Sequence, residues 1–537
     1  MVITGNLIDI HTNSIYPAEI EIAGNQIHKI KKVTTPVTDQ YILPGFVDAH
    51  VHIESSMLVP TEFARLAVVH GTVATVSDPH EIGNVLGIKG VEFMIENGKQ
   101  SPFKFYFGAP SCVPATTFET AGAVIGVEDV DYLLSKPEIK YLAEMMNWPG
   151  VLHKDPEVYK KIALAKKYHK PVDGHAPGLF GDDAKNYITA GITTDHECYT
   201  EKEALGKLKH GMKILIREGS AAKNFNALVD LINEHFESMM FCSDDKHPDS
   251  LVEGHINSLV KRALQKKIDL FKLLRVACYN PVVHYKLDVG LLREGDSADF
   301  IVIDNPVDFN VLKTFINGML VAENGKSKLN SSNCIPVNNF KASNIDKEEL
   351  EIHHSNDKIA AIEVIDGELI TNRLDIAPTV SGNLMIADTS KDLLKIVVVN
   401  RYNKAKPAIA FIKNFQLKEG ALASSVAHDS HNIIAVGVDD DSITQAINLI
   451  VQQKGGIAAV SKKQEKIIPL PVAGLMSNTD GYAIANDYIE IDRMAKEMGS
   501  KLLSPFMSLS FMALLVIPSV KLSDLGLFDG KKFEFIK

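Results

Sequence analysis

The stretch at residues 48–54 reads DAHVHIE and places an aspartate, two histidines and a glutamate at alternate positions. In a β-strand alternate side chains point to the same face, so His50 and His52 would project together, about 7 Å apart along the backbone. Two imidazoles in that arrangement can reach one cation. Because the apolar residues Phe46 and Val47 lead into the motif, we expect a buried strand that ends at a metal site, not a half-exposed polar strand.

Further groups of the same chemistry follow later apolar runs, where strands are expected to end: Glu144, His175, His196, Asp244 and Asp245. A single histidine is more often an ordinary polar residue than a ligand, but a set that recurs at one structural position is hard to explain by chance. Imidazoles and carboxylates without a thiolate favour Mn, Fe or Zn over copper or an iron–sulfur centre. Four histidines and two carboxylates exceed the needs of one tetrahedral ion, so we expect two ions, bridged by Glu144. The predicted ligands are His50, His52, Glu144, His175, His196 and Asp244.

The elements that must position these groups repeat between residues 45 and 285. Short apolar or β-branched runs end in polar residues, and amphipathic helical patterns such as 156–170 follow them. Eight strand-and-helix units over about 240 residues match a (β/α)8 TIM-like barrel in count and size. Catalytic groups of such barrels gather at the carboxyl ends of the strands, which is where the polar residues fall.

The segments around the predicted barrel have a different pattern. Residues 1–44 and 286–335 alternate like short antiparallel strands with turns between them. We expect these two segments to pair into one small β-sandwich domain, in which the barrel, residues 45–285, is inserted. Residues 340–537 mix strand-like runs with two helical patterns and predict a separate C-terminal α+β domain. The predicted fold class is therefore α/β, with a barrel, a small composite β domain and a C-terminal domain.

Composition narrows the partners and the compartment. The chain of 537 residues has a net charge of −11, which argues against a general nucleic-acid or anionic-membrane partner. Residues 511–520, the longest late apolar run, are too short to span a bilayer and contain a proline. The five cysteines are odd in number and never spaced CxxC, and no positively charged apolar leader opens the sequence. We expect a soluble protein of a reducing compartment, the cytoplasm.

The ligand set resembles the amidohydrolase superfamily, with paired histidines after the first strand, single histidines after the fifth and sixth, and an aspartate after the eighth. Many members bridge their metals with a carboxylated lysine after the fourth strand, whereas Glu144 holds that place here, as in the microbial adenine deaminase family. Longer stretches resemble that family in particular and cover nearly the whole chain. These stretches lie at 43–57, 70–87, 142–151, 172–179, 191–200, 215–224, 241–250, 400–402 and 424–433.

The resemblance implies hydrolytic deamination of adenine to hypoxanthine and ammonia, by a hydroxide held between two Mn²⁺ or Fe²⁺ ions. The partners are then adenine and water, with no nucleic acid and no membrane, and we expect a homo-oligomer in the form of a dimer. The proton transfers need a carboxylate that acts first as a base and then as an acid. Asp244 is our choice for that shuttle, beside Glu144 as the catalytic bridge. Asp245 competes with it, because strand alternation would turn only one of the pair inward.

Other strand-end residues are candidates for binding the purine: Asp78, His80, Arg217, Glu218 and Asp245. An equally good interpretation is that they form salt bridges that stabilise the open end of the barrel. Residues 54–56 follow the metal histidines and are equally candidates for supporting them by hydrogen bonds. Residues 428–431 read HDSH and have metal-like spacing, but no third ligand is near in sequence. We therefore favour a polar loop that leans over the active site.

A different deaminase signature does not fit. His52 to Glu54 matches the H-x-E half of the zinc nucleoside deaminase signature, which also needs P-C-x-x-C. The comparable run here, PSCVP at residues 110–114, has a single cysteine. If the chain deaminates a base, it does so with the chemistry of the barrel.

Two alternatives stay open at this point. Another hydrolase of the same barrel class, acting on a cyclic amide or an N-acetylated sugar, would use the same ligands. Glu144, the stretches DPHE and REGSA, and the long C-terminal region favour the deaminase over such an enzyme. The second alternative is a catalytically inactive barrel that serves as a scaffold. It is disfavoured because such relatives usually lack a ligand, whereas every expected position is filled here.

Overall fold

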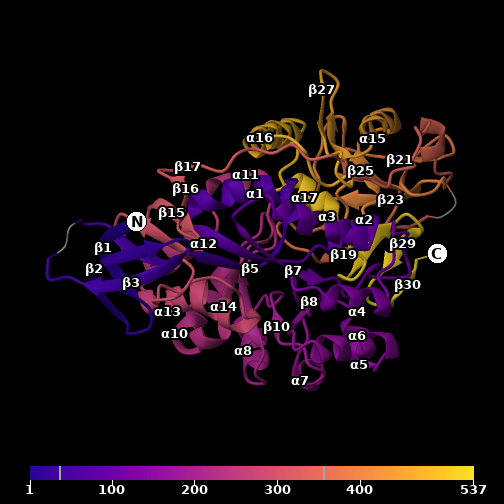
Figure 1. Cartoon of the computed structure of the whole chain (residues 1–537). Coiled ribbons are helices and arrows are strands. Elements are labelled where there is room, and N and C mark those ends of the chain that lie inside the picture. The colour runs from indigo at the N-terminus through magenta and orange to yellow at the C-terminus, as the bar shows by residue number, and fades with distance from the viewer. Residues whose placement is uncertain (36–37, 355–356, 537) are drawn as a thin grey trace.

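The computed structural model describes residues 1–35, 38–354 and 357–536. Positions 36, 37, 355, 356 and 537 fall within the predicted small β domain and C-terminal domain and lie outside the described residues. Figure 1 shows the arrangement of the three parts. A small sheet carries the N-terminus at the left, the barrel fills the lower middle, and the orange and yellow C-terminal region covers the upper right.

Eight parallel strands form the barrel. They are β5 (Phe46–His52), β6 (Thr72–Ser77), β7 (Lys104–Ala109), β8 (Ile139–Met145), β9 (Val172–Gly174), β10 (Thr194–Asp195), β11 (Lys213–Arg217), and β12 (Met239–Cys242) with its short continuation β13 (Asp244–Asp245). Neighbours in chain order pair in parallel, and a bridge from Val172 to Ile192 joins β9 to the residues before β10. Because β13 pairs in parallel with β5, the sheet closes on itself. The predicted (β/α)8 barrel is confirmed.

The barrel strands are apolar because helices and side chains cover both of their faces. Every residue of β5, β6 and β12 is buried, as expected for parallel strands between two layers. The covering helices are α1 (Pro60–Ala67), α2 (His80–Leu86), α3 (Ile88–Gly98), α4 (Val127–Ser135), α5 (Trp148–Leu152), α6 (Pro156–Lys167), α7 (Gly181–Thr189), α8 (Glu201–Leu208), α9 (Phe225–Leu228), α10 (Ile232–His235), α11 (Pro248–Glu253), α12 (Ile256–Gln265), α13 (Leu270–Leu274) and α14 (Asn280–Tyr285). Local sequence fixes their ends: Asp155 accepts the first free N–H groups of α6, and Pro156 occupies its first position.

The small β domain is one eight-stranded sheet built from the segments on both sides of the barrel. Its strands, in sheet order, are β17 (Lys326–Ser327), β16 (Met319–Glu323), β15 (Val311–Ile316), β14 (Phe300–Ile303), β4 (Tyr41–Pro44), β1 (Val2–Asp9), β2 (Ser14–Ala23) and β3 (Gln26–Lys32). The strand that leads into the barrel, β4, pairs antiparallel with β14, which follows the barrel. A bridge from Gln26 to Ser297 brings the far edge of the sheet back beside β14. The sheet thus folds over a shared apolar cluster, which includes Leu7, Ile20 and Phe300, as a sandwich does.

The C-terminal region is an α+β domain. The strands of its main sheet, in sheet order, are β19 (Thr371–Ile376), β18 (Ile359–Val364), β23 (Ala408–Lys413), β22 (Leu394–Val399), β25 (Ile433–Gly437), β24 (Ala421–Ser424), β26 (Gly456–Val460) and β27 (Glu465–Pro469). Smaller sheets pair β20 (Thr379–Ser381) with β21 (Leu384–Ile386), and β28 (Val520–Ser523) with β29 (Gly526–Asp529) and β30 (Glu534–Phe535).

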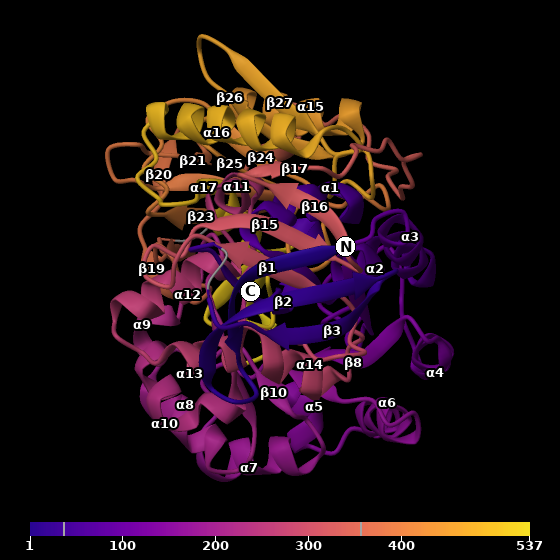
Figure 2. The same cartoon turned by 60° about the vertical axis from the view of Figure 1, so that its left-hand side comes forward.

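The helices α15 (Asp440–Gln453), α16 (Gly481–Glu497) and α17 (Pro505–Phe511) belong to this domain, and α16 also contacts the barrel. The two helical patterns of the sequence form α15, which covers one face of the main sheet, and α16, which packs against α11 and α1 of the barrel. The third, α17, packs against β24 and β25. Figure 2 shows the domain lying across the top of the barrel. The residue limits of the three predicted domains stay a prediction.

Two observations concern the compartment. Among the described residues, the helices are all too short or too polar to cross a membrane. The five cysteines are all among the described residues and form no disulfide there, and four of them are buried.

Candidate active site

The carboxyl ends of the barrel strands bring the six predicted ligands into one buried cluster. His50 and His52 come from β5, Glu144 from β8 and Asp244 from β13, while His175 and His196 directly follow β9 and β10. Each of these residues is at most 6% exposed. Covered strands with little freedom to move are elements that can hold such groups in a fixed geometry.

Glu144 lies in the middle of the cluster. Its Oε1 is 3.3 Å from Nε2 of His52, and its Oε2 is 3.0 Å from Nδ1 of His175 and 3.3 Å from Nε2 of His196. The two oxygens of one carboxylate therefore face imidazoles from opposite sides of the barrel. This is the arrangement of a carboxylate that can bridge two ions.

Asp244 faces the other histidines. Its Oδ1 lies 3.4 Å from Nε2 of His50 and 3.1 Å from Nε2 of His52. The backbone of Asp244 is left-handed, with a φ of 54°, so strand alternation does not hold here and Asp245 also lines the cavity. The expectation that only one of the pair would turn inward was wrong, because it assumed a regular strand. Asp245 accepts a hydrogen bond of 2.5 Å from Ser55.

The charges of the cluster fit a pair of cations. Burial opposes ionisation of Glu144, but the imidazoles of His175, His196 and His52 hold its pKa well below the usual value. Burial likewise opposes a charge on His196, but hydrogen bonds to Glu144 and Glu197 hold its pKa well above the usual value. Divalent cations in place of those imidazole protons would satisfy the same ionised carboxylates.

The donor atoms also gather in the right number. Two groups have donor atoms within 4.8 Å of one another: His50 with His196 and Asp244, and Glu144 with His175 and His196. Nitrogen and oxygen donors without thiolate suit Mn, Fe or Zn. The cluster therefore suggests a binuclear metal site, in which the residues present fit two divalent ions.

Neighbouring backbone groups orient the histidines. Nδ1 of His52 lies 3.2 Å from the carbonyl oxygen of Asp78, so this nitrogen donates and Nε2 is left to face the site. Beneath the cluster, Asp48 accepts hydrogen bonds from the N–H of Ser243 at 3.0 Å and pairs with Nε2 of His255 at 2.8 Å. Asp48 thus ties β5 to the segment that closes the barrel and does not itself reach the cavity.

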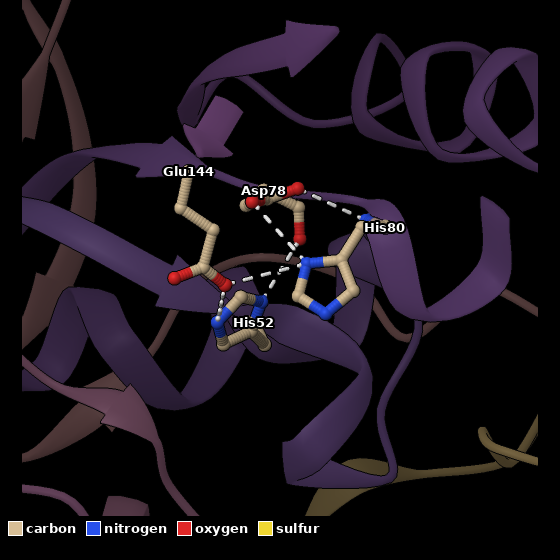
Figure 3. A group of neighbouring side chains, drawn as sticks. All are labelled: His52, Asp78, His80 and Glu144. Carbon is tan, nitrogen blue, oxygen red and sulfur yellow. Dashed lines mark hydrogen bonds and ion pairs between the residues drawn. The ribbon is translucent and has the colours of Figure 1, made fainter. Parts of the chain in front are cut away.

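Two of the residues considered for substrate binding lie beside the ligands, as Figure 3 shows for His52, Asp78, His80 and Glu144. Oδ2 of Asp78 is 3.2 Å from Nδ1 of His80, and the same nitrogen is 3.5 Å from Oε1 of Glu144. The imidazole of His80 therefore stands between the carboxylate of Asp78 and the predicted bridge.

Two further candidates, Arg217 and Glu218 at the end of β11, separate in space. Arg217 is buried and its Nη1 lies 2.6 Å from Oδ2 of Asp244, while the same guanidinium contacts Glu197 and the hydroxyl of Tyr199. Glu218, the next residue, pairs instead with Arg262 at 2.6 Å and is not among the cavity-lining residues. The structure thus brings Arg217 to the site and turns Glu218 away.

The cavity above the ligands is closed by the C-terminal domain. The C-terminal domain lines it with Leu369, His428, Asp429 and Leu514. The barrel residues that line it are His52, His80, Glu81, Glu144, Met146, His175, His196, Glu197, Arg217, Asp244 and Asp245. His428 and Asp429 belong to the loop between β24 and β25 and are each only 3% exposed. The HDSH loop therefore lies over the site.

Sequence reasoning missed two carboxylates of the site. Oε1 of Glu197 lies 3.3 Å from Nε2 of His196, and Glu81 contacts Nδ1 of His428 at 2.5 Å as well as Nε2 of His431. Glu197 directly follows His196, and Glu81 directly follows His80. Their position at the ends of strands could therefore have identified both glutamates as site residues. The pairing of Glu81 with His428 has no local sequence signal, since the partners lie in different domains.

Comparison with known proteins agrees with this geometry. Residues 41–321 match the amidohydrolase family, and residues 368–534 match the adenine deaminase C-terminal domain. The chain is 55% identical to adenine deaminase from Sulfurovum sp. (strain NBC37-1) over 537 residues, 100% of this chain and 99% of that protein. It is 51% identical to adenine deaminase from Salinibacter ruber over 99% of this chain and 98% of that protein. Among solved structures, N-acetylglucosamine-6-phosphate deacetylase from Pasteurella multocida covers 60% of this chain and 100% of its own, with 16% identity and a TM-score of 0.47.

Proposed function

Because this chain belongs to the adenine deaminase family of the amidohydrolases, we propose that it converts adenine and water to hypoxanthine and ammonia. The observation that carries the proposal is the 55% identity to an adenine deaminase over the whole length of both chains. A barrel acting on a cyclic amide or an N-acetylated sugar, and an inactive scaffold, are not favoured by relatives that match from end to end.

We propose Mn²⁺ or Fe²⁺ as the ions. The donors, imidazoles and carboxylates alone, are compatible with both, and the choice of these two over Zn²⁺ follows the resemblance to the adenine deaminase family. His50, His52 and Asp244 would hold one ion, His175 and His196 the other, and Glu144 would be shared between them. Two such ions supply Lewis acidity that lowers the pKa of a water toward neutrality.

Asp244 is the residue we assign to proton transfer. In the reaction a C–O bond forms at C6 of the purine and the bond from C6 to the amino nitrogen breaks. Of the two hydrogens of water, one must reach the departing ammonia and the other must reach N1 of the ring. Burial opposes ionisation of Asp244, but Arg217 and the neighbouring histidines hold its pKa well below the usual value. The carboxylate therefore begins as a base, takes a proton from the attacking water and returns it to the amino group.

Arg217 orients the carboxylate of Asp244 for proton transfer. Its contact with Oδ2 of Asp244 leaves Oδ1 facing His50 and His52, and Glu197 balances the charge on the far side of the guanidinium. We propose Arg217 as a positioning residue for Asp244. His80 and Asp245 remain our candidates for contacts with the purine. Asp78, which faces His80 and is not among the cavity-lining residues, would instead hold that imidazole in place. Glu218 is no longer a candidate, because it pairs with Arg262 outside the cavity.

The test is turnover by the Mn²⁺-loaded protein of five compounds, each followed by its own product. Ammonia release is measured with adenine and adenosine, the ring-opened N-carbamoyl acid with hydantoin and dihydroorotate, and acetate release with N-acetylglucosamine 6-phosphate. We expect adenine to be the best substrate by kcat/KM, because the relatives that match this chain from end to end are adenine deaminases. Preference for adenosine would overturn the free-base assignment. Turnover of a cyclic amide or the acetylated sugar without turnover of adenine would overturn the function.

We further propose a homodimer that works in the cytoplasm. Its acidic surface and reduced cysteines support an intracellular protein without a nucleic-acid partner. Light scattering during size-exclusion chromatography measures the assembly: a mass of two chains is expected, and a monomer would contradict the proposal.

A further inference from the structure

The HDSH loop reaches the cavity through a set of buried side chains that the proposed reaction has not used. His428, Asp429 and His431 are each no more than 3% exposed. They meet Glu81 of α2, which is 1% exposed. A carboxylate of the barrel thus lies between two imidazoles of the C-terminal domain, at the edge of the active-site cavity.

The hydrogen bonds fix the tautomer of His431. The backbone N–H of Ala427 donates to Nδ1 of His431 at 3.2 Å, so Nδ1 is an acceptor and the hydrogen of the neutral ring is on Nε2. That nitrogen contacts Oε2 of Glu81, so its hydrogen faces the carboxylate. Burial also lowers the pKa of His431, which agrees with a neutral ring. No lone pair of His431 is left for a cation, so the cluster is a hydrogen-bonded chain and not a third metal site.

His428 completes the chain on the cavity side. Its Nδ1 lies 2.5 Å from Oε1 of Glu81. Nε2, the other ring nitrogen, therefore points away from Glu81. Nε2 is buried and has no hydrogen-bond partner among the described residues; the nearest charged group facing it is Asp245, 3.9 Å away. The ring packs against Phe511, with centroids 5.3 Å apart, so it is held in this orientation.

The ring of His428 carries a hydrogen on both nitrogens at neutral pH. Burial opposes the charged form, but Glu81, Asp245 and Asp429 raise the pKa of His428 to about 9. Nε2 is therefore a charged N–H donor that lines the cavity without an acceptor. Since an unpaired buried donor is costly, its position indicates that a bound molecule supplies the acceptor.

We propose that His428 is a substrate-contacting residue, whose Nε2–H donates a hydrogen bond to a ring nitrogen of the purine. Adenine has lone pairs at N1, N3 and N7, each of which can accept a hydrogen bond. The barrel residues around the cavity are mostly carboxylates, which are acceptors, and imidazoles that face the ion site. Glu81 and His431 act as positioning residues that fix the ring and its protonation. The inference rests on the proposed function and adds the C-terminal domain to the substrate site.

The first test compares two substitutions of His428 in the Mn²⁺-loaded enzyme. His428→Asn keeps an amide nitrogen near the place of Nδ1 but removes the Nε2 donor, and we expect kcat/KM for adenine to fall roughly 10- to 100-fold. His428→Gln extends an amide nitrogen toward the place of Nε2, and we expect it to recover part of the loss. Metal content and melting temperature should stay at wild-type values in both variants.

His247→Asn is the matched control. His247 is also a buried histidine at the contact between the two domains, where it packs against Tyr488, but it does not line the cavity. We expect this variant to keep wild-type kcat/KM. If His428→Asn keeps kcat/KM within about threefold of the wild type, or loses no more than His247→Asn, the contact with substrate is refuted.

The second test identifies the acceptor with 1-, 3- and 7-deazaadenine, measured as competitors of adenine. Each analogue lacks one ring nitrogen, so His428→Asn should weaken the binding of two analogues and leave the third unchanged, as in a double-mutant cycle. An equal loss for all three analogues would overturn the proposal. A wild-type enzyme that fails to deaminate adenine would instead refute the proposed function, so the two failures are distinguishable.

Discussion

The two sides of the active-site cavity are built by different means. On the barrel side, the ligands sit at the ends of buried parallel strands, and the strand order alone brings His50, Glu144 and Asp244 together. On the other side, His428 stands on a loop that meets the cavity only because the C-terminal domain packs onto the barrel. Ion binding is thus fixed by the inner fold of one domain, whereas the proposed contact with the purine depends on the docking of another.

This difference predicts separable defects. Changes among the strand-end residues should remove metal and activity together, since the ions and the reaction share the same ligands. Changes in Glu81 or the HDSH loop should reduce activity on adenine while the metal content stays constant. The following predictions are ordered by the size of the expected effect on activity.

Glu144→Gln should have the largest effect. The substitution keeps the shape but removes the charge, and it places an amide nitrogen where an oxygen faces His52 or His175. We expect metal content to fall toward one ion per chain and kcat to fall by roughly a hundredfold or more. Elemental analysis beside steady-state kinetics measures both. Wild-type stoichiometry together with wild-type kcat would remove the bridge from the mechanism.

His175→Ala should lower metal content and activity in parallel. One imidazole is lost from the group it forms with Glu144 and His196, and water is a weaker replacement. Excess Mn²⁺ should restore part of the activity, and treatment of the wild type with a chelator should mimic the variant. His210→Ala, at an exposed turn, is the control and should change neither quantity. A variant that retains both ions would show that His175 is not a ligand.

Glu81→Gln should weaken catalysis without loss of metal. We expect kcat/KM to fall roughly 10- to 100-fold, because the substitution removes the charged partner of His428. The wild-type kcat/KM should also decline as the pH rises through about 9, where His428 loses its proton. Removal of the negative charge lowers that pKa, so the decline should begin at lower pH in the variant. An unchanged pH profile would contradict the link between Glu81 and His428.

Lys521→Met should have the smallest effect on activity and a distinct effect on stability. Burial lowers the pKa of Lys521 to about 7, against an ordinary value of 10.5. Between these pH values the unfolded chain binds more protons than the folded one, so this group makes stability rise with pH. The slope of unfolding free energy against pH should decrease in the variant over that window. Identical slopes for the two proteins would show that Lys521 titrates normally in the folded state.

The sequence was informative wherever local pattern determines structure. Eight apolar runs with polar ends predicted the barrel, and strand-end position alone selected the six residues that meet in the cluster. The same reasoning failed where a single backbone angle breaks the pattern: Asp244 has a left-handed backbone, so both it and Asp245 line the cavity. It also placed Glu218 with Arg217, although neighbouring residues of a strand point to opposite faces.

The contribution of the C-terminal loop could not be predicted in the same way. His428 and His431 have the spacing of ligands, but their third partner, Glu81, is in another domain and far away in the chain. Only the packing of α16 and the neighbouring elements on the barrel brings these groups together. A backbone donor, the N–H of Ala427, then determines that the cluster is a hydrogen-bonded chain. Neither contact can be predicted from the pattern of neighbouring residues in the sequence.

The small sheet has a consequence for synthesis of the chain on the ribosome. The strand β4 ends at Pro44, but its antiparallel partner β14 begins at Phe300. At ordinary rates of translation the intervening residues, about 250 of them, take ~10–50 s to appear. During that time β4 has a free edge of unpaired backbone groups, which can pair with the same strand of a neighbouring nascent chain. The fraction of correctly folded protein during rapid expression should therefore depend on the spacing of ribosomes along the mRNA. It should also depend on how soon chaperones bind this strand edge.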